Sequence, residues 1–293
     1  MNSRLKSGNY EEYDACLNEI VSWISGFGIR VSPTRVGEYR KSFSELLRIS
    51  KTKDFTTAEH RVDEFLNTLY EFHELQEIYN GFRDKELNEY VKPRLEKIVS
   101  GPSSYQNEQN KKSEARNYAL ELLIASRLSQ GGIFVPPLNA SDATCKIDGR
   151  EIIFECKRPQ FATTVDKNIK RACKQLKSRY LNSISFLSRG IVGVDISKSF
   201  NPSFQKLRYS NEQDITQFMG KVIASFESEY LKTLHSIKEK RTIAVLVRFS
   251  ALALPIENGG RISYCQQYGL LVLPGVSGVD AGLANKLGLR IKN

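Results

Sequence analysis

The stretch Asp142-Ala-Thr-Cys-Lys-Ile-Asp-Gly-Arg-Glu-Ile-Ile-Phe-Glu-Cys-Lys157 holds two short runs of β-forming residues on either side of an Asp-Gly pair. Asp-Gly tolerates the positive φ angles of a tight turn, so residues 143–147 and 151–156 are predicted to form a β-hairpin. Successive side chains on a strand point to opposite faces, which places Glu155 and Lys157 on one face. The hairpin also returns Asp142, before the first strand, to the side of Glu155.

Glu155 and Lys157 stand at the end of an otherwise apolar strand, and unpaired charge is costly to bury there. Two neighbouring carboxylates, Asp142 and Glu155, are a donor set suited to Mg²⁺. An adjacent ammonium, that of Lys157, can orient or deprotonate an attacking water. A salt bridge that happens to fall on a strand is the alternative interpretation. Asp148 is a competing acid, but its place before a glycine explains it as a turn residue.

The composition is that of an ordinary globular chain, with 40% hydrophobic and 26% charged residues over 293 positions. The net charge of +10 is unevenly placed, because residues 1–100 carry −2 and the remainder carries +12. A polyanionic partner is therefore favoured for the part that contains the hairpin, although a basic surface can also serve solubility alone.

Several classes of protein are disfavoured by what the sequence lacks. Five cysteines without a C-x-x-C pair indicate a reducing compartment, and three scattered histidines argue against a zinc site. The polar first residues do not resemble a signal peptide, and no apolar run approaches the roughly 18 residues of a membrane span. We therefore expect a soluble, cytoplasmic protein that does not enter membranes.

Residues 1–100 are predicted to form a helical region, and the polar, turn-rich residues 101–110 a linker to a second domain over 111–293. The expected helices span 10–27, a segment from Ser32-Pro33 through Leu47, a segment from the capping box Thr56–Glu59 to about Tyr79, and about 85–99 with a break or restart at Pro93. Their aromatic residues are expected in a core. A protein partner for this region stays open.

The second domain is predicted to begin with a helix from Ser113 to Gly131, in which Glu121 lies among apolar residues and needs a partner. An ion pair with a neighbouring lysine is one interpretation. Strands are expected at 132–137, in the hairpin, at 190–196, at 242–254 and at 262–273. Helices are expected after Asp166 and over 211–237.

The helix after Asp166 has a basic face opposite its packing stripe. That face is either solvated or a track for phosphates, and its residues are Lys167, Lys170, Arg171, Lys174 and Lys177.

The hairpin carries an Asp followed, after a variable gap, by Glu-x-Lys. The elements around it come in the order helix, three strands, basic helix, strand. Together these features resemble the PD-(D/E)XK nuclease superfamily over about residues 111–198. The segments Arg116-Asn-Tyr-Ala-Leu-Glu-Leu-Leu and Ile153-Phe-Glu-Cys-Lys-Arg-Pro159 look like bacterial members of that superfamily. Ser141 stands where the family often has proline. The resemblance implies an α/β fold with a restriction-endonuclease-like αβββαβ core and a mixed central sheet.

The resemblance also implies a site and an activity. Asp142, Glu155 and Glu121, the helix-borne acid, would hold Mg²⁺ or Mn²⁺ together with the backbone carbonyl of Cys156, and Lys157 would activate water. Gln175 resembles a glutamine that some members place after Glu-x-Lys. The expected activity is that of a magnesium-dependent endonuclease acting on DNA in preference to RNA, in restriction or anti-phage defence, with a homodimer open. The alternative is an inactive nucleic-acid-binding or protein-interaction module on the same fold.

Overall fold

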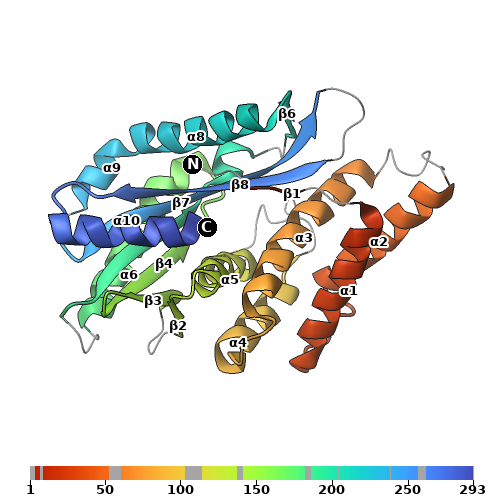
Figure 1. Cartoon of the computed structure of the whole chain (residues 1–293), viewed down its shortest axis with the longest axis horizontal. Coiled ribbons are helices and arrows are strands. Elements are labelled where there is room, and N and C mark those ends of the chain that lie inside the picture. Colours follow the sequence, from red (N-terminus) through yellow and green to blue (C-terminus); the bar gives the residue numbers. More distant parts are fainter. Residues whose placement is uncertain are drawn as a thin grey trace. The chain divides into compact units, whose positions relative to one another are not determined.

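The computed structural model describes residues 4–6, 9–52, 61–102, 114–136, 141–181, 186–202, 205–237, 239–256 and 262–292 (Figure 1). The chain divides into two compact units, and the division falls inside one helix, between Ser126 and Arg127. The first, helical unit comprises Lys6–Ser126 with Arg261–Tyr264, and the second, sheet unit comprises Met1–Leu5, Arg127–Gly260 and Cys265–Asn293. Most of the predicted linker lies outside the described residues.

The helical unit contains α1 (Tyr10–Gly26), α2 (Arg35–Thr52), α3 (Val62–Phe82), α4 (Asn88–Val99) and most of α5 (Glu114–Gln130). The expected helices are thus present, but two of their details were wrong. The second helix begins at Arg35 rather than at Ser32-Pro33, because residues 31–34 form a turn in which Thr34 N donates to Val31 O. In α4 the helix continues through Pro93 without a break. The predicted capping box at 56–59 lies outside the described residues.

Aromatic side chains form the centre of the helical unit, as expected. The ring of Tyr13 lies 5.3 Å from that of Phe72 and 6.1 Å from that of Phe43, and all three are buried. α3 also buries charge. Glu71 lies between the guanidinium groups of Arg116, at 2.8 Å, and Arg35, at 3.7 Å. Because these ions have one another as partners, their burial does not leave an isolated charge.

The sheet unit is built on one mixed sheet, in which eight strands are found among the described residues. The strands are β1 (Arg4–Lys6), β2 (Phe134–Val135), β3 (Ala143–Ile147), β4 (Arg150–Lys157), β5 (Arg189–Asp195), β6 (Leu207–Tyr209), β7 (Thr242–Pro255) and β8 (Ser263–Val272). Their order is β1-β8-β7-β5-β4-β3-β2, and β6 pairs with β7 outside this path. β2, β3 and β4 are antiparallel, whereas β4, β5 and β7 run parallel. The predicted α/β class and mixed sheet are confirmed.

The β3–β4 pair is the predicted hairpin. Ala143 stands opposite Phe154, and the turn residues Asp148 and Gly149 have φ angles of 49° and 76°. Glycine has no Cβ and reaches this region without strain, and aspartate is among the residues that tolerate it. The turn therefore sets the register that carries Asp142 back to Glu155.

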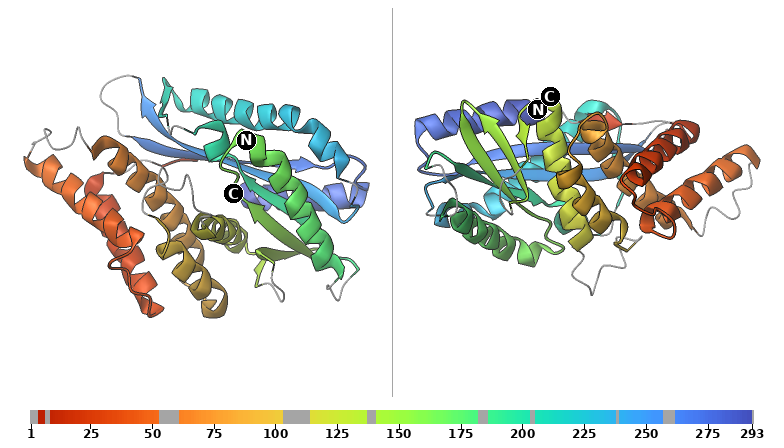
Figure 2. Two further views of the ribbon diagram at one scale, coloured as in Figure 1. Left: turned by 180° about the vertical axis from the view of Figure 1, so that it is seen from behind. Right: turned by 90° about the horizontal axis from the view of Figure 1, so that it is seen from below.

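Helices cover both faces of the sheet (Figure 2). α6 (Val165–Leu181), α8 (Glu212–Glu229) and α9 (Leu231–Ser236) share one apolar core with Ile153 and Val192 of the sheet. α10 (Gly278–Lys292) lies on the other face. The predicted single helix over 211–237 is divided at Tyr230, and neither α10 nor the short α7 (Ser197–Phe200) was predicted. No helix in the described part of the chain is long and apolar enough to cross a membrane.

Candidate active site at the end of the β3–β4 hairpin

The hairpin brings the three predicted residues together at the carboxyl-terminal end of β4. Asp142 Oδ2 accepts a hydrogen bond of 2.6 Å from the backbone N–H of Cys156, which holds this carboxylate beside Glu155. Glu155 is completely buried, on the strand face that α6 covers, and Lys157 is the last residue of β4. Asp142, Glu155 and Lys157 therefore lie next to one another, as the alternation along the strand predicted.

The two oxygens of Glu155 differ in their surroundings. Oε1 accepts a hydrogen bond of 3.0 Å from Nε of Arg179, near the end of α6. Oε2 is buried and has no hydrogen-bond partner among the described residues, and Lys157 Nζ lies 3.9 Å away. Lys157 Nζ instead donates to the backbone carbonyl of Cys156 at 2.9 Å. One carboxylate oxygen at the centre of the cluster is therefore left for a further ligand.

The protonation of Glu155 is set by competing effects. Burial and the negative charge of Asp142 raise its pKa to about 7, although Arg179 and Lys157 act in the opposite direction. Two adjacent carboxyl groups repel each other when both are ionised, and burial of Glu155 strengthens this repulsion. A cation bound between them would relieve that repulsion and favour the ionised form.

The donor set at this site suits Mg²⁺ better than a transition metal. No group of three or more Asp, Glu, His or Cys side chains able to hold a metal occurs in the described part of the chain. Mg²⁺, however, keeps several waters and commonly binds through one or two carboxylates. Asp142 and Glu155 fit this requirement. The carbonyl oxygen of Cys156 can accept two bonds, so its contact with Lys157 does not exclude its predicted role as a ligand.

Glu121, the predicted helix-borne acid, lies on α5 within the helical unit. It is buried, and its Oε2 accepts a hydrogen bond of 3.0 Å from Arg94 Nε. The Arg94 guanidinium also lies over the ring of Tyr90, 4.0 Å from its centroid. This ion pair accounts for a carboxylate among apolar residues, with arginine in place of the lysine considered above. The role of Glu121 as a metal ligand stays a prediction.

α6 presents its predicted basic residues to solvent, and contacts on its two flanks show which of them are near the site. All five, Lys167, Lys170, Arg171, Lys174 and Lys177, are exposed. Arg179 marks the flank beside Glu155, and Gln175 and Arg171 precede it at four-residue steps. Asp166, which accepts a hydrogen bond from Thr233 of α9, marks the opposite flank, and Lys170 follows Asp166 by one turn. Residues one turn apart share a helix face, so Arg171 and Lys170 lie toward different flanks.

Gln175 lies on the site flank of α6 and is partly buried. Its side-chain oxygen has no hydrogen-bond partner among the described residues. This amide oxygen can still accept a hydrogen bond, and the predicted nucleic-acid-binding role of Gln175 stays a prediction. Arg179, the residue that contacts Glu155 directly, was not predicted, although its place one turn after Gln175 was a usable signal.

A second charged cluster at the same edge of the sheet was also not predicted from the sequence. Asp195, the last residue of β5, accepts hydrogen bonds from Arg158 at 2.6 and 2.9 Å and also pairs with Arg248 of β7. Burial alone would raise the pKa of Asp195, but the two guanidinium groups hold it well below its usual range. A charge that interrupts an apolar strand, as Asp195 and Arg248 do, was the available signal.

The strands and helices define an α/β protein with a mixed sheet, in which two carboxylates and a lysine meet at the end of a hairpin. No protein-family model, no curated protein and no solved structure matches the chain.

Proposed function

We propose that the protein is a metal-dependent nuclease that hydrolyses phosphodiester bonds, with DNA favoured over RNA as the substrate. The observation that carries the proposal is the grouping of Asp142, Glu155 and Lys157 at the end of β4, where Glu155 Oε2 is buried without a hydrogen-bond partner among the described residues. A buried carboxylate oxygen without a partner calls for an explanation, and a bound cation would supply one.

Each side chain has a separate role in the proposed mechanism. Asp142 and Glu155 would hold Mg²⁺ or Mn²⁺, with the carbonyl of Cys156 as a further predicted ligand. The metal would neutralise charge on the scissile phosphate and on the leaving oxygen. Lys157 would orient the attacking water as an ammonium or, once deprotonated, accept its proton. The hydrogen bond from Lys157 Nζ to Cys156 O holds this group beside Glu155. Arg179 would keep the Glu155 carboxylate from rotating.

The distribution of charge supports the proposed substrate, and the order of the elements supports the proposed fold. The part of the chain after residue 100 carries a net charge of +12, and exposed basic side chains lie on α6 next to Gln175. The chain order α5, β2, β3, β4, α6, β5 is also the αβββαβ order of the restriction-endonuclease-like core. A role in restriction or anti-phage defence belongs to this proposal as the setting in which such nucleases act.

Cleavage of supercoiled and linear DNA, with and without Mg²⁺ or Mn²⁺, tests the activity. We expect metal-dependent cutting by the wild type and at least a hundredfold slower cutting by the Glu155→Gln and Lys157→Ala variants. Lys146→Ala is the matched control, because Lys146 is an exposed lysine of the same hairpin. Cutting that persists in both site variants, or that falls equally in the control, contradicts the assignment of the site.

An inactive nucleic-acid-binding module is the second candidate, and the pairing within the cluster favours it. The Arg179–Glu155 ion pair and the Asp142–Cys156 hydrogen bond satisfy much of the buried charge without a metal. This candidate predicts salt-sensitive DNA binding that is equal in wild type and Asp142→Ala, with no cutting in any divalent cation and of neither DNA nor RNA.

A further inference from the structure

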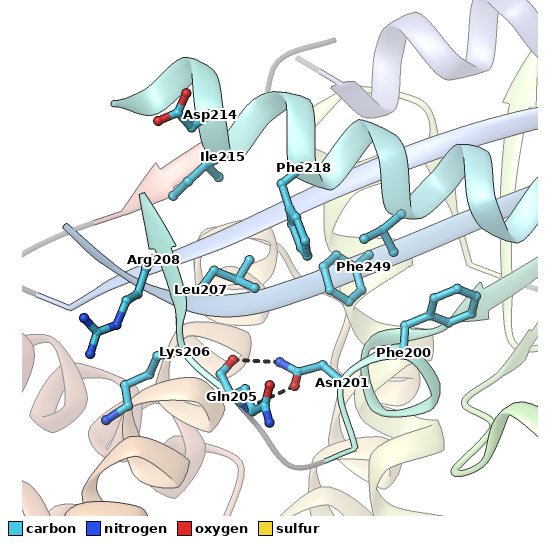
Figure 3. A pocket seen from close by; sticks show the side chains of 11 residues that line it. Phe200, Asn201, Gln205, Lys206, Leu207, Arg208, Asp214, Ile215, Phe218 and Phe249 are labelled. Atoms are coloured by element: carbon cyan, nitrogen blue, oxygen red, sulfur yellow. Dashed lines mark hydrogen bonds between the residues drawn. The ribbon is translucent and has the colours of Figure 1, made fainter. Parts of the chain in front are cut away.

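A pocket of about 420 Å³ lies in the sheet unit, between α8, β6 and the chain that follows α7 (Figure 3). Phe249 of β7 contributes to its base, and Phe218 reaches down from α8 toward Phe249. A volume of this order is typical of sites for small organic molecules. None of the described residues that line it belongs to the candidate active site.

The apolar part of the pocket offers one half-exposed aromatic ring, that of Phe218, above the buried ring of Phe249. The ring of Phe218 lies 6.4 Å from that of Phe249, and its side chain is 43% exposed. Leu207 and Ile215 extend this surface. A half-exposed aromatic face suits a flat ring that stacks on it, whereas an alkyl chain is better held in an enclosed slot.

The rim of the pocket is cationic. The side chains of Lys206 and Arg208 are exposed, neither makes a hydrogen bond or ion pair with a described residue, and both point away from the apolar base. Asp214, the one acid among the described lining residues, has a different task. Its carboxylate accepts hydrogen bonds from the backbone amides of Ser210 and Asn211, at 3.1 and 3.3 Å, and thereby caps α8. The net charge around the opening therefore favours an anionic group in the ligand.

A hydrogen bond connects the wall of the pocket to the chain segment that follows the candidate active site. Phe200 and Asn201 line the pocket at the end of α7, which follows β5. Within α7, Ser199 Oγ donates a hydrogen bond of 2.8 Å to the carbonyl of Pro159, two residues after Lys157. Both sites thus lie along the carboxyl-terminal ends of the parallel strands β4 and β5, the edge where open α/β sheets bind their ligands.

We propose that this pocket binds one nucleotide, whose base stacks on Phe218 and whose phosphate is held by Arg208 and Lys206. The stronger form of this proposal rests on the proposed nuclease function. In that form the bound nucleotide is part of the substrate strand that continues from the active site. The same chemistry could come from a free nucleotide, and the experiment separates the two sources.

The test measures binding by the full-length protein in EDTA, so that cleavage plays no part. The first probe is a short single-stranded oligonucleotide containing 2-aminopurine, whose fluorescence falls when the base stacks. We expect quenching with the wild type, and about 5- to 30-fold weaker binding with loss of the quenching in Phe218→Ala. Arg208→Ala should weaken binding and reduce its dependence on salt. Phe186→Ala is the control, because it removes an aromatic ring that is 93% exposed and does not line the pocket.

The second probe is deoxyadenosine 5′-monophosphate, added as a competitor. If it displaces the oligonucleotide from wild type and fails to bind Phe218→Ala, the pocket takes free nucleotides. If only the oligonucleotide binds through Phe218, the strand is the source. Equal binding of both probes by wild type, Phe218→Ala and Phe186→Ala overturns the proposal. Binding through Phe218 in a protein that never cuts nucleic acid would refute the nuclease proposal and leave the nucleotide site standing.

Discussion

Glu155 combines two properties that conflict in an apolar environment, because it is fully buried and lies beside another carboxylate. Its pKa of about 7 in the folded protein exceeds its ordinary value of 4.5. Below pH 4.5 the group is protonated in both folded and unfolded chains and has no effect on their balance. As pH rises toward 7, only the unfolded chain ionises freely, so the folded state loses stability in this window.

We therefore expect Glu155→Gln to stabilise the metal-free protein at neutral pH. The gain should approach about 3 kcal/mol by pH 8, from the difference between the two pKa values, and should disappear below pH 4.5. Urea unfolding of wild type and variant in EDTA, at intervals from pH 4 to pH 8, measures it. Asp148→Asn serves as the control, since Asp148 is an exposed turn residue. A difference that is constant with pH contradicts the assigned cause.

Residues whose role depends on local spacing could be predicted from the sequence. The alternation of a strand and an Asp-Gly turn are enough to place Asp142, Glu155 and Lys157 together. Arg179 and Asp195 could not be placed in the same way, because their partners come from other elements. Whether Arg179 or Arg248 reaches a carboxylate depends on how α6 and β7 pack on the sheet, and no local pattern encodes that packing.

At the scale of an element, α6 separates basic residues that the sequence places in one group. Arg171 shares the flank of Gln175 and Arg179, whereas Lys170 and Lys177 lie toward the flank of Asp166. Lys174 points away from the sheet, between the two flanks. If nucleic acid runs along the site, only part of the predicted basic face contacts it.

The double variants Arg171→Glu/Lys174→Glu and Lys170→Glu/Lys177→Glu carry the same net charge and so form a matched pair. We expect the first to bind DNA more weakly and to lower the magnitude of the slope of log K against log [salt] by about 2, since about 0.9 is lost for each phosphate contact. The second should change the slope by less than half as much. Fluorescence anisotropy over a range of salt concentrations measures both slopes. Equal losses would indicate a diffuse electrostatic effect without a defined track.

Elements were predictable where a single period or turn determines them. The hairpin, β5, β7, β8 and α6 follow from alternation, β-branched runs and helical spacing. β6 has only three residues, and Gly282 and Gly288 interrupt the apolar pattern of α10, so neither element gave a clear signal. The division of the predicted helix over 211–237 at Tyr230 depends on how α8 and α9 pack on the sheet, which periodicity alone does not reveal.

At the scale of the whole molecule, the proposed metal binding would be linked to global stability. A cation that binds only the folded chain stabilises it by RT ln(1 + [L]/Kd), about 1.4 kcal/mol for each tenfold excess over Kd. The raised pKa of Glu155 represents a cost that a bound cation offsets, so the wild type should respond strongly.

We expect MgCl₂ to raise the melting temperature of the wild type in a concentration-dependent manner, and to leave Glu155→Gln and Asp142→Asn unchanged. Differential scanning calorimetry at pH 8 measures the shift, with KCl at equal ionic strength to account for screening. Asp148→Asn should behave as the wild type, because it removes an acid of the same hairpin outside the site. A rise that is equal in all four proteins would place the cation elsewhere.

The parallel strands also determine the order in which the chain can fold as it is synthesised. The hairpin joins near neighbours, with Ala143 opposite Phe154, and can form as soon as it leaves the ribosome. Glu155 can pair with Val192 only after β5 has been synthesised, and Val194 with Val247 only after β7, because parallel strands are joined by a crossover connection. Such distant pairing slows folding. Until β5 arrives, the nascent chain exposes an unpaired edge of β4 that a second copy could occupy.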